Sequence, residues 1–396
     1  MDGGWNEHGE DVGRRIAHWR KVRGLTQTGL ARAAHVSRSL IAQVEAGHKP
    51  ATPSLVAAVA AALEVEPALL SGRPYRRESG RADAAHRAIP AIRRALAYAD
   101  LAPEVDTPPR SLDALDEELA VAQRLQAAAQ YVRLGARLPA VIEELTVHAV
   151  QTGLPRAWQL LNRADAIAAS LARRLGYHDL AQVAIERAAV AAHRADDPHL
   201  PRLVLLSRAL LLLSVKATDL ALAMAVRAAA EVDRELPGGL AVYGALQLRA
   251  AVAAARAGLA RQAWEHHGEA EEVARRLGDR PDRYGLQVLP GNVAIHGCAI
   301  AVELGDHDRA LRMDERLELS PPLSPERRAH HEIDMARACL AAGRHKEALA
   351  RILKAEKIAP QMARYHPTSR ETVMELERKY RTLPESLRAL ERRMGL

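Results

Sequence analysis

The sequence predicts an all-α protein in two parts, a small N-terminal helical bundle and a long array of helical hairpins. Aromatic residues make up 3% of the 396 residues, phenylalanine is absent and alanine dominates. This composition favours closely packed helices, because alanine has the highest helix propensity and β-branched residues, which strands prefer, are sparse. From residue 135 onward a glycine–alanine pattern recurs about every 40 residues. The larger part is therefore expected to be built from a repeated helical unit.

Two short helices joined by a tight turn are predicted between Thr26 and Gly47. Thr26 suits the N-cap of the first helix, since its hydroxyl can accept a hydrogen bond from a free amide of the first turn. His35-Val36-Ser37 reads as the turn, and Ser37 as the cap of the second helix. Leu30, Ala33 and Ala34 fall on one face of the first helix at helical spacing, and Ile41 and Val44 point inward from the second.

The outer face of the second helix carries Arg38, Ser39 and Gln43. A short helix with such side chains near its start has the shape that reads base edges in a major groove. Arginine matches the two acceptors of guanine, and glutamine matches adenine. Phosphates are the expected partners of three residues near helix ends: Gln27, Ser37 and Lys49. The alternative for any one of these residues is a solvated side chain with no ligand.

Residues 11–70 resemble the XRE (Cro/C1-type) helix-turn-helix family. The resemblance is carried by Gln27, Leu30-Ala31, Val36-Ser37, Ile41, Glu45-x-Gly47 and Pro50. In such domains an arginine of the first helix pairs with the glutamate before the glycine, which here implies a structural pair of Arg20 and Glu45. The sequence departs from the family at Ala34-His35, where a glycine usually precedes the valine. Histidine can adopt the left-handed conformation needed there.

A linker is expected over residues 77–110, between an N-terminal domain (residues 1–76) and a repeat domain (residues 111–396). Its second half holds Pro103, Pro108 and Pro109. Residues 79–99 have a helical pattern, with Pro90 expected to break or kink it. From Ser111 a capped helix leads into the repeats.

The repeat frame is a glycine followed five residues later by alanine. It occurs at Gly135/Ala140, Gly176/Ala181, Gly258/Ala263, Gly305/Ala310 and Gly343/Ala348, and Lys216/Ala221 fits it with lysine in place of glycine. The pattern predicts a helix, a tight turn and a second helix, stacked roughly six times. It resembles the tetratricopeptide repeat, most closely over Glu326 to Pro360. The tail from Thr368 is expected to cap the last repeat.

The resemblance to tetratricopeptide arrays implies a concave surface that binds peptides or small ligands. Asn162 and Asn292 both fall on the first helix of a repeat, the helix that lines the groove in such arrays. An amide can donate to and accept from a peptide backbone, which makes these two asparagines candidate ligand-binding residues. The alternative is an asparagine on a helix surface with no ligand role.

Several classes of protein are disfavoured. The N-terminus has no signal-peptide pattern, and the most apolar region, Leu203 to Val226, is interrupted by Arg208, Lys216 and Asp219. The two cysteines have no zinc-site spacing and make no disulfide framework, which suits a reducing compartment. A cytoplasmic, nucleoid-associated protein is therefore expected. Common catalytic and nucleotide-binding motifs are absent. We therefore expect no enzyme, no catalytic residue, no cofactor, no metal and no membrane partner.

Charge and motif together favour DNA as the partner. The net charge is +7, and residues 10–76 hold ten Lys or Arg against five Asp or Glu, a balance of +5 that suits attraction to phosphates. The sequence predicts a DNA-binding transcription regulator. By resemblance it is a homodimer on a near-palindromic operator, modulated by a peptide or small-molecule effector at the repeats. The alternative is a tetratricopeptide-like scaffold or adaptor that binds a partner protein, with the helix-turn-helix secondary.

Overall fold

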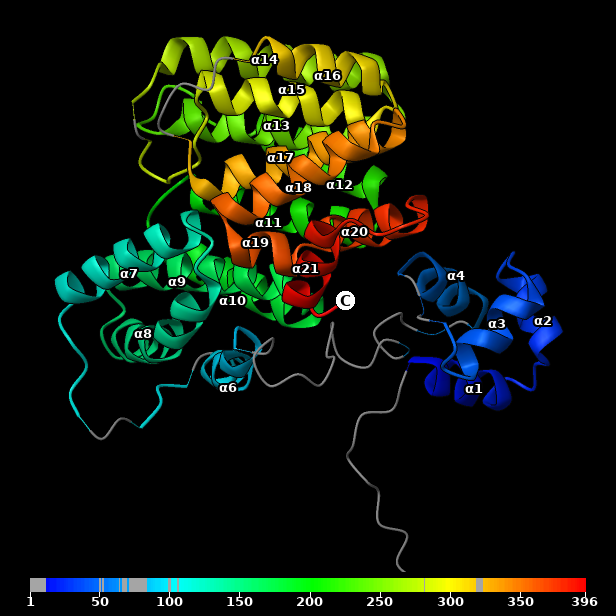
Figure 1. Ribbon diagram of the computed structural model, residues 1–396. Coiled ribbons are helices and arrows are strands. Elements are labelled where there is room, and N and C mark those ends of the chain that lie inside the picture. Colours follow the sequence, from blue (N-terminus) through cyan, green and yellow to red (C-terminus); the bar gives the residue numbers. More distant parts are fainter. Residues whose placement is uncertain are drawn as a thin grey trace, which may run out of the picture. The chain divides into compact units, whose positions relative to one another are not determined.

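The computed structural model describes residues 12–49, 51, 53–63, 65, 70, 84–98, 101–104, 107–280, 282–317 and 323–396. Every regular element in these ranges is a helix, which confirms the predicted all-α class. The chain divides into two compact units between residues 83 and 84 (Figure 1). Each unit has its own hydrophobic core.

The N-terminal unit contains four described helices, α1 (Val12–Val22), α2 (Gln27–Ala33), α3 (Arg38–Glu45) and α4 (Pro53–Leu63). The core lies between them and is built from Ile16, Leu30, Ile41, Val44, Val59 and Leu63. Gly13 lets α1 approach the end of α3, because a β-carbon there would lie 1.9 Å from the carbonyl oxygen of Val44. The expected helical bundle is therefore present.

The second unit is an array of six hairpins among the residues described. Their helices are α7 (Leu112–Ala127) with α8 (Tyr131–Thr152), α9 (Pro155–Arg174) with α10 (His178–Arg194), α11 (Leu200–Ser214) with α12 (Thr218–Ala230), α13 (Gly239–Arg256) with α14 (Ala260–Leu277), α15 (Pro290–Glu303) with α16 (His307–Glu315), and α17 (Pro325–Ala341) with α18 (His345–Ile358). The odd-numbered helices from α7 to α17 pack on one another in succession and form one layer, and the even-numbered helices of the hairpins lie beside it.

The turns of five hairpins are where the repeat frame places them. Gly176, Gly258, Gly305 and Gly343 have φ between 73° and 84°, and Lys216 takes the same left-handed conformation with φ 65°. The alanines five residues after these anchors are almost fully buried: Ala181, Ala221, Ala263, Ala310 and Ala348. In these five hairpins, the anchor residue therefore marks a tight turn, and the alanine five residues later marks the place where the two helices pack closely.

The first anchor of the frame was wrong. Gly135 lies inside α8, and the turn between α7 and α8 is at Ala129, whose φ is 53°. Gly135 instead permits a close approach of the short 3-10 helix η1 (His86–Ala88), because a β-carbon there would lie 2.7 Å from Cβ of Ala88. Glycine is thus used for two different reasons in this frame: a left-handed turn at the later anchors and a close contact between helices at Gly135.

Part of the segment expected to be a linker is packed into the second unit. Helix α6 (Ile89–Ala97) lies on α8 and α10 and buries Ile89, Ile92, Ala95 and Leu96. Pro90 sits in the first turn of α6, where a proline needs no amide partner, so it begins the helix and does not kink it. Residues 79–83 of the predicted helix lie outside the described residues.

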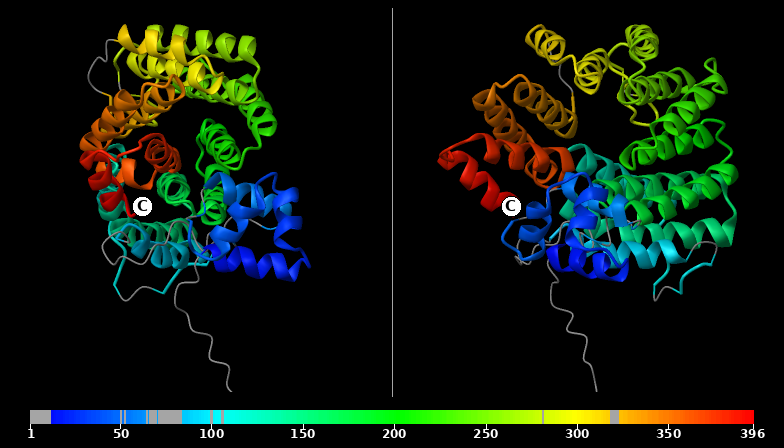
Figure 2. Two further views of the ribbon diagram at one scale, coloured as in Figure 1. Left: turned by 45° about the vertical axis from the view of Figure 1, so that its right-hand side comes forward. Right: turned by 90° about the vertical axis from the view of Figure 1, so that its right-hand side faces the viewer.

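The end of the array returns to its beginning (Figure 2). The hydroxyl of Tyr131 on α8 donates to Sδ of Met362 at 3.1 Å, and the amide of Val132 donates to Oε1 of Gln361 at 3.0 Å. Arg174 on α9 forms an ion pair with Glu326 on α17. The first two hairpins are therefore in direct contact with the last hairpin and the helix after it.

Three helices follow the last hairpin, α19 (Pro360–Tyr365), α20 (Pro367–Lys379) and α21 (Glu385–Met394). Helix α20 packs on α17 and α18, and α21 packs on α19 and α20 with Leu387, Leu390 and Met394 buried. This confirms that the tail caps the last repeat. Among the residues described, no helix combines the length and the apolarity that a membrane span requires.

Candidate nucleic-acid interface

The tight turn between α2 and α3 is built by local hydrogen bonds. Oγ1 of Thr26 accepts from the amide of Gly29 at 3.0 Å, and Oγ of Ser37 accepts from the amide of Leu40 at 3.1 Å. His35 adopts a left-handed conformation, with φ 53°. Both predicted caps and the predicted conformation of the turn are thus confirmed. They set the angle at which α3 leaves α2.

A buried ion pair joins α1 to the end of α3. Nε and Nη2 of Arg20 donate to the two carboxylate oxygens of Glu45 at 2.7 and 2.8 Å, and Nη1 donates to the carbonyl of Leu25 at 2.9 Å. The side chains of Arg20 and Glu45 are 12% and 6% exposed. This bidentate ion pair, together with the bond from Arg20 to Leu25, fixes the end of α3 against α1.

Gln27 is hydrogen-bonded to the same ion pair. Its Nε2 donates to Oε2 of Glu45 at 2.9 Å, which links α2 to the pair. Burial would raise the pKa of Glu45, but the hydrogen bonds from Arg20 and Gln27 outweigh it and the pKa lies below its usual value. The carboxylate is therefore charged at neutral pH, and part of the Gln27 amide is already used inside the protein.

The first turn of α3 presents two exposed residues, Arg38 and Ser39. Neither side chain makes a hydrogen bond or ion pair with the described part of the chain. Lys49, just after α3, is also exposed. A cation and a hydroxyl on the first turn of a rigidly held helix can donate to base edges or phosphates.

Gln43 and Ser37, which were also expected to contact DNA, are less available than Arg38 and Ser39. Gln43 is only half-exposed, and its Oε1 is buried without a partner in the residues described. The hydroxyl of Ser37 caps α3 through its oxygen and keeps its proton for another acceptor. Contacts from Gln27, Ser37 and Gln43 to DNA stay predictions, and for Gln43 such a contact requires a rotation of the side chain.

In the repeat unit, Asn162 and Asn292 are both buried. Nδ2 of Asn162 donates to the carbonyl of Ala188 at 2.7 Å and so ties α9 to α10. Nδ2 of Asn292 donates to the carbonyl of Gln287 at 2.7 Å, in the turn before α15, while its Oδ1 is buried without a partner in the described structure. Both amides therefore have a structural use, and their role in ligand binding stays a prediction.

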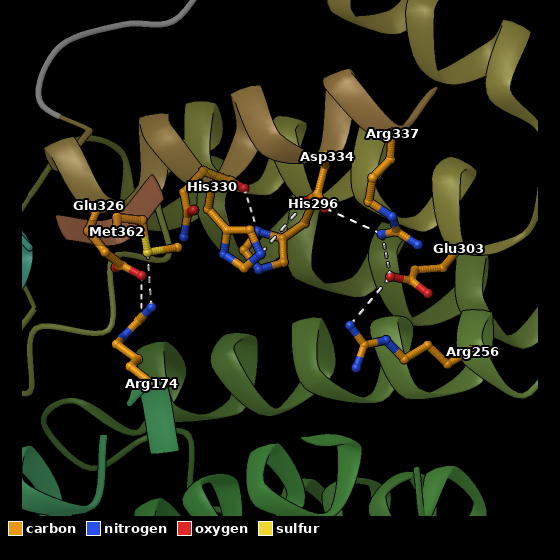
Figure 3. Close-up of polar contacts among 10 residues, drawn as sticks. Arg174, Arg256, His296, Glu303, Glu326, His330, Asp334, Arg337 and Met362 are labelled. Carbon is orange, nitrogen blue, oxygen red and sulfur yellow. Dashed lines mark hydrogen bonds and ion pairs between the residues drawn. The ribbon is translucent and has the colours of Figure 1, made fainter. Parts of the chain in front are cut away.

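Sequence reasoning missed a row of polar side chains on the layer of odd-numbered helices (Figure 3). Glu303 on α15 accepts from Arg256 on α13 at 3.3 Å and from Arg337 on α17 at 3.0 Å. Arg337 also reaches Asp334, at 3.5 Å. In Figure 3, His296 and His330 lie between this group and the pair of Arg174 and Glu326. The available signal was the presence of Arg256 and Glu303 at the ends of the largely apolar helices α13 and α15.

The N-terminal unit also matches a known family. Residues 11–71 match the family model described as a helix-turn-helix domain. The N-terminal unit is a helix-turn-helix domain. Because this motif places its second helix in the major groove, α3 is the candidate recognition helix for DNA.

Two solved structures show a weaker likeness over a longer stretch. BtubC (BKLC) from P. vanneervenii is 20% identical, with 64% of this chain and 94% of that chain covered and a TM-score of 0.32. PlcR from Bacillus thuringiensis, solved with the peptide PapR7 and DNA, is 12% identical, with 98% and 94% covered and a TM-score of 0.29. No curated protein matches the sequence. At such TM-scores the architecture of the repeats rests on the structure of this chain alone.

Proposed function

We propose that this protein is a sequence-specific transcription regulator whose helix-turn-helix domain reads DNA as a homodimer and whose repeat unit senses a ligand. The observation that carries the proposal is the exposed first turn of α3, with Arg38 and Ser39 held outward by the ion pair of Arg20 and Glu45. A base-reading side chain needs both exposure and a fixed helix beneath it. No catalytic step is part of this function.

The roles at the DNA follow from the chemistry of each side chain. Arg38 donates two parallel N–H groups to a guanine, and Ser39 contacts a neighbouring base or sugar. Gln43, after rotation, reads an adenine. Ser37 and Lys49 donate to phosphates and set the register, as does the part of Gln27 that Glu45 leaves available. Together these residues define one half-site.

Two copies of the domain would read two half-sites of a near-palindrome, since the two-fold symmetry of a dimer is mirrored in its operator. The repeat unit supports this function through its layer of odd-numbered helices. Polar and charged residues gather on the odd-numbered helices, where a ligand can contact several hairpins at once (Figure 3). A ligand that binds one arrangement of the repeats better than another would shift the separation of the two DNA-binding domains.

The test is the selection of binding sites from a random DNA pool with the full-length protein at near-physiological salt. We expect an inverted repeat whose half-site spacing reports the dimer, and a molar mass of two chains in solution. A strictly monomeric mass would contradict the dimer. Failure to recover any consensus, with and without cell-derived small molecules, would favour the scaffold alternative.

A further inference from the structure

Three arginines on the layer of odd-numbered helices have no partner in the described structure. They are Arg173 on α9, Arg249 on α13 and Arg327 on α17, and each is half-buried. None of their guanidinium groups makes a hydrogen bond or ion pair with the described residues, and Nε of each is buried and unpaired. We call these three residues the arginine cluster.

Nearby carboxylates are already engaged by other arginines. Glu326 is bonded to Arg174, and Glu303 is shared by Arg256 and Arg337 (Figure 3). The fold thus satisfies three arginines of this layer. It leaves the arginine cluster without a carboxylate of its own.

The members of the cluster lie within electrostatic reach of one another. Burial, together with the positive charges of Arg327 and Arg173, lowers the pKa of Arg249 to about 9. Burial also lowers the pKa of Arg173 to about 9, with Arg174 acting in the same direction and the charge of Glu326 in the opposite one. Both Arg173 and Arg249 therefore still carry their charge at neutral pH. The charged groups with the largest effect on Arg249 are all arginines, and no carboxylate pairs with it among the described residues.

A buried charge without a partner raises the free energy of the folded state. An anion would remove this penalty, and guanidinium groups are suited to it because each can donate two parallel N–H groups to a pair of oxygens. A carboxylate offers only two oxygens, whereas a phosphoryl group offers three around one centre. Three arginines from three helices therefore match a phosphoryl group better than a carboxylate.

We propose that the arginine cluster binds a small molecule that carries a phosphate group. The inference rests on the proposed function, since it assigns a chemical class to the ligand of the repeat unit. Arg173, Arg249 and Arg327 come from the second, fourth and sixth hairpins. A bound phosphate would therefore link three hairpins that are far apart in the sequence, which is the way in which a ligand could change the curvature of the array.

The test uses the full-length protein without DNA, titrated with pyrophosphate or inorganic phosphate at constant ionic strength and followed by calorimetry and thermal unfolding. We expect saturable binding and a rise in Tm with anion concentration. Arg249→Gln should weaken binding about tenfold or more, because one charge-assisted contact is lost. Arg261→Gln is the matched control, since Arg261 is 86% exposed on α14 and its loss changes the net charge equally.

A second readout separates binding from a structural role. Without anion, Arg249→Gln should melt no lower than the wild type, because the substitution removes a repelled charge. A lower Tm without anion, together with unchanged binding, would overturn the proposal. So would the absence of saturable binding to either phosphate, or acetate binding as tightly as phosphate. If Arg249→Gln does not fold, Arg173→Gln and Arg327→Gln repeat the test.

This titration is independent of the DNA experiment. A failure of site selection with intact phosphate binding would overturn the proposed function and leave the arginine cluster as an anion site. A recovered operator with no phosphate binding would support the proposed function and overturn the arginine cluster as an anion site.

Discussion

Arg20 of the helix-turn-helix domain and three arginines of the repeat unit differ in whether the chain supplies them with a partner. In the helix-turn-helix domain, Arg20 is held by both carboxylate oxygens of Glu45 and by a backbone carbonyl. In the repeat unit, Arg173, Arg249 and Arg327 have no such partner in the part of the chain that the structure describes. Pairing makes the first domain complete by itself. In our proposal the repeat unit is completed by an anion from outside the chain.

The largest effect is expected where a paired arginine loses its partner. Glu45→Ala leaves the guanidinium of Arg20 buried and unpaired, which should destabilise the helix-turn-helix domain by about 3 kcal/mol or more. Hydrogen exchange of α1–α4, measured by mass spectrometry, should show a large loss of protection, with the repeat unit unchanged. Unchanged protection of α1–α4 would contradict the structural role of the pair.

The counterpart in the repeat unit is Arg174→Gln. Glu326 would then be buried without its direct hydrogen-bond partner, and the contact between α9 and α17 would be lost. We expect a cost of about 2–3 kcal/mol, smaller than for Glu45, because Arg173 and Arg327 also stabilise the charge of Glu326. Thermal unfolding should show a lower Tm than for Arg261→Gln. An equal Tm in the two variants would mean that the unpaired arginines replace Arg174 completely.

An exposed arginine should affect binding and leave stability unchanged. Arg38→Ala removes a side chain with no partner among the described residues, so the Tm of the protein should stay within the error of the wild type. DNA affinity for the selected operator should fall roughly 10- to 100-fold, equivalent to about 1–3 kcal/mol. Arg14→Ala, exposed on α1, is the control. Equal affinities of the two variants would argue against base reading by Arg38.

The smallest effect is expected from acid acting on Glu45. Its pKa in the folded protein lies below the usual value of 4.5, although burial acts against this, because Arg20 and Gln27 donate to the carboxylate. Its contribution to stability is therefore complete above pH 4.5 and is lost as the pH falls through the lower folded value. The unfolding free energy of the domain should fall more steeply below pH 4.5 in the wild type than in Glu45→Gln. Parallel slopes would show that Glu45 does not control the acid response.

The helix-turn-helix domain could be predicted from the sequence because its determinants are local. The caps at Thr26 and Ser37, the left-handed His35 and the apolar spacing of Leu30 and Ile41 all act within a few residues. The engagement of Gln27 by Glu45 and the burial of the Gln43 oxygen depend on packing between helices. These contacts are therefore beyond the reach of spacing arguments.

For the repeat unit, the length of the repeat could be predicted from the sequence, but the way in which the array curves back on itself could not. Alanines at fixed distances from a turn report the crossing of two neighbouring helices, so the hairpins could be found. Small rotations add up over six hairpins, and only their sum decides that Arg174 meets Glu326 and Tyr131 meets Met362. The same sum decides which arginines are left unpaired. The turn at Ala129 was missed because alanine gives no signal of a left-handed conformation.

The contact between Tyr131 and Met362 also bears on how the array unfolds. Linear arrays of repeats unravel from their ends, because a terminal repeat has a neighbour on one side only. Here the first hairpin is braced by the helix that follows the last one, through Tyr131 and Val132. Fraying at either terminus would have to break contacts of both. The array is therefore expected to melt in a single cooperative step, with removal of the C-terminal helices loosening the first hairpin as much as the last.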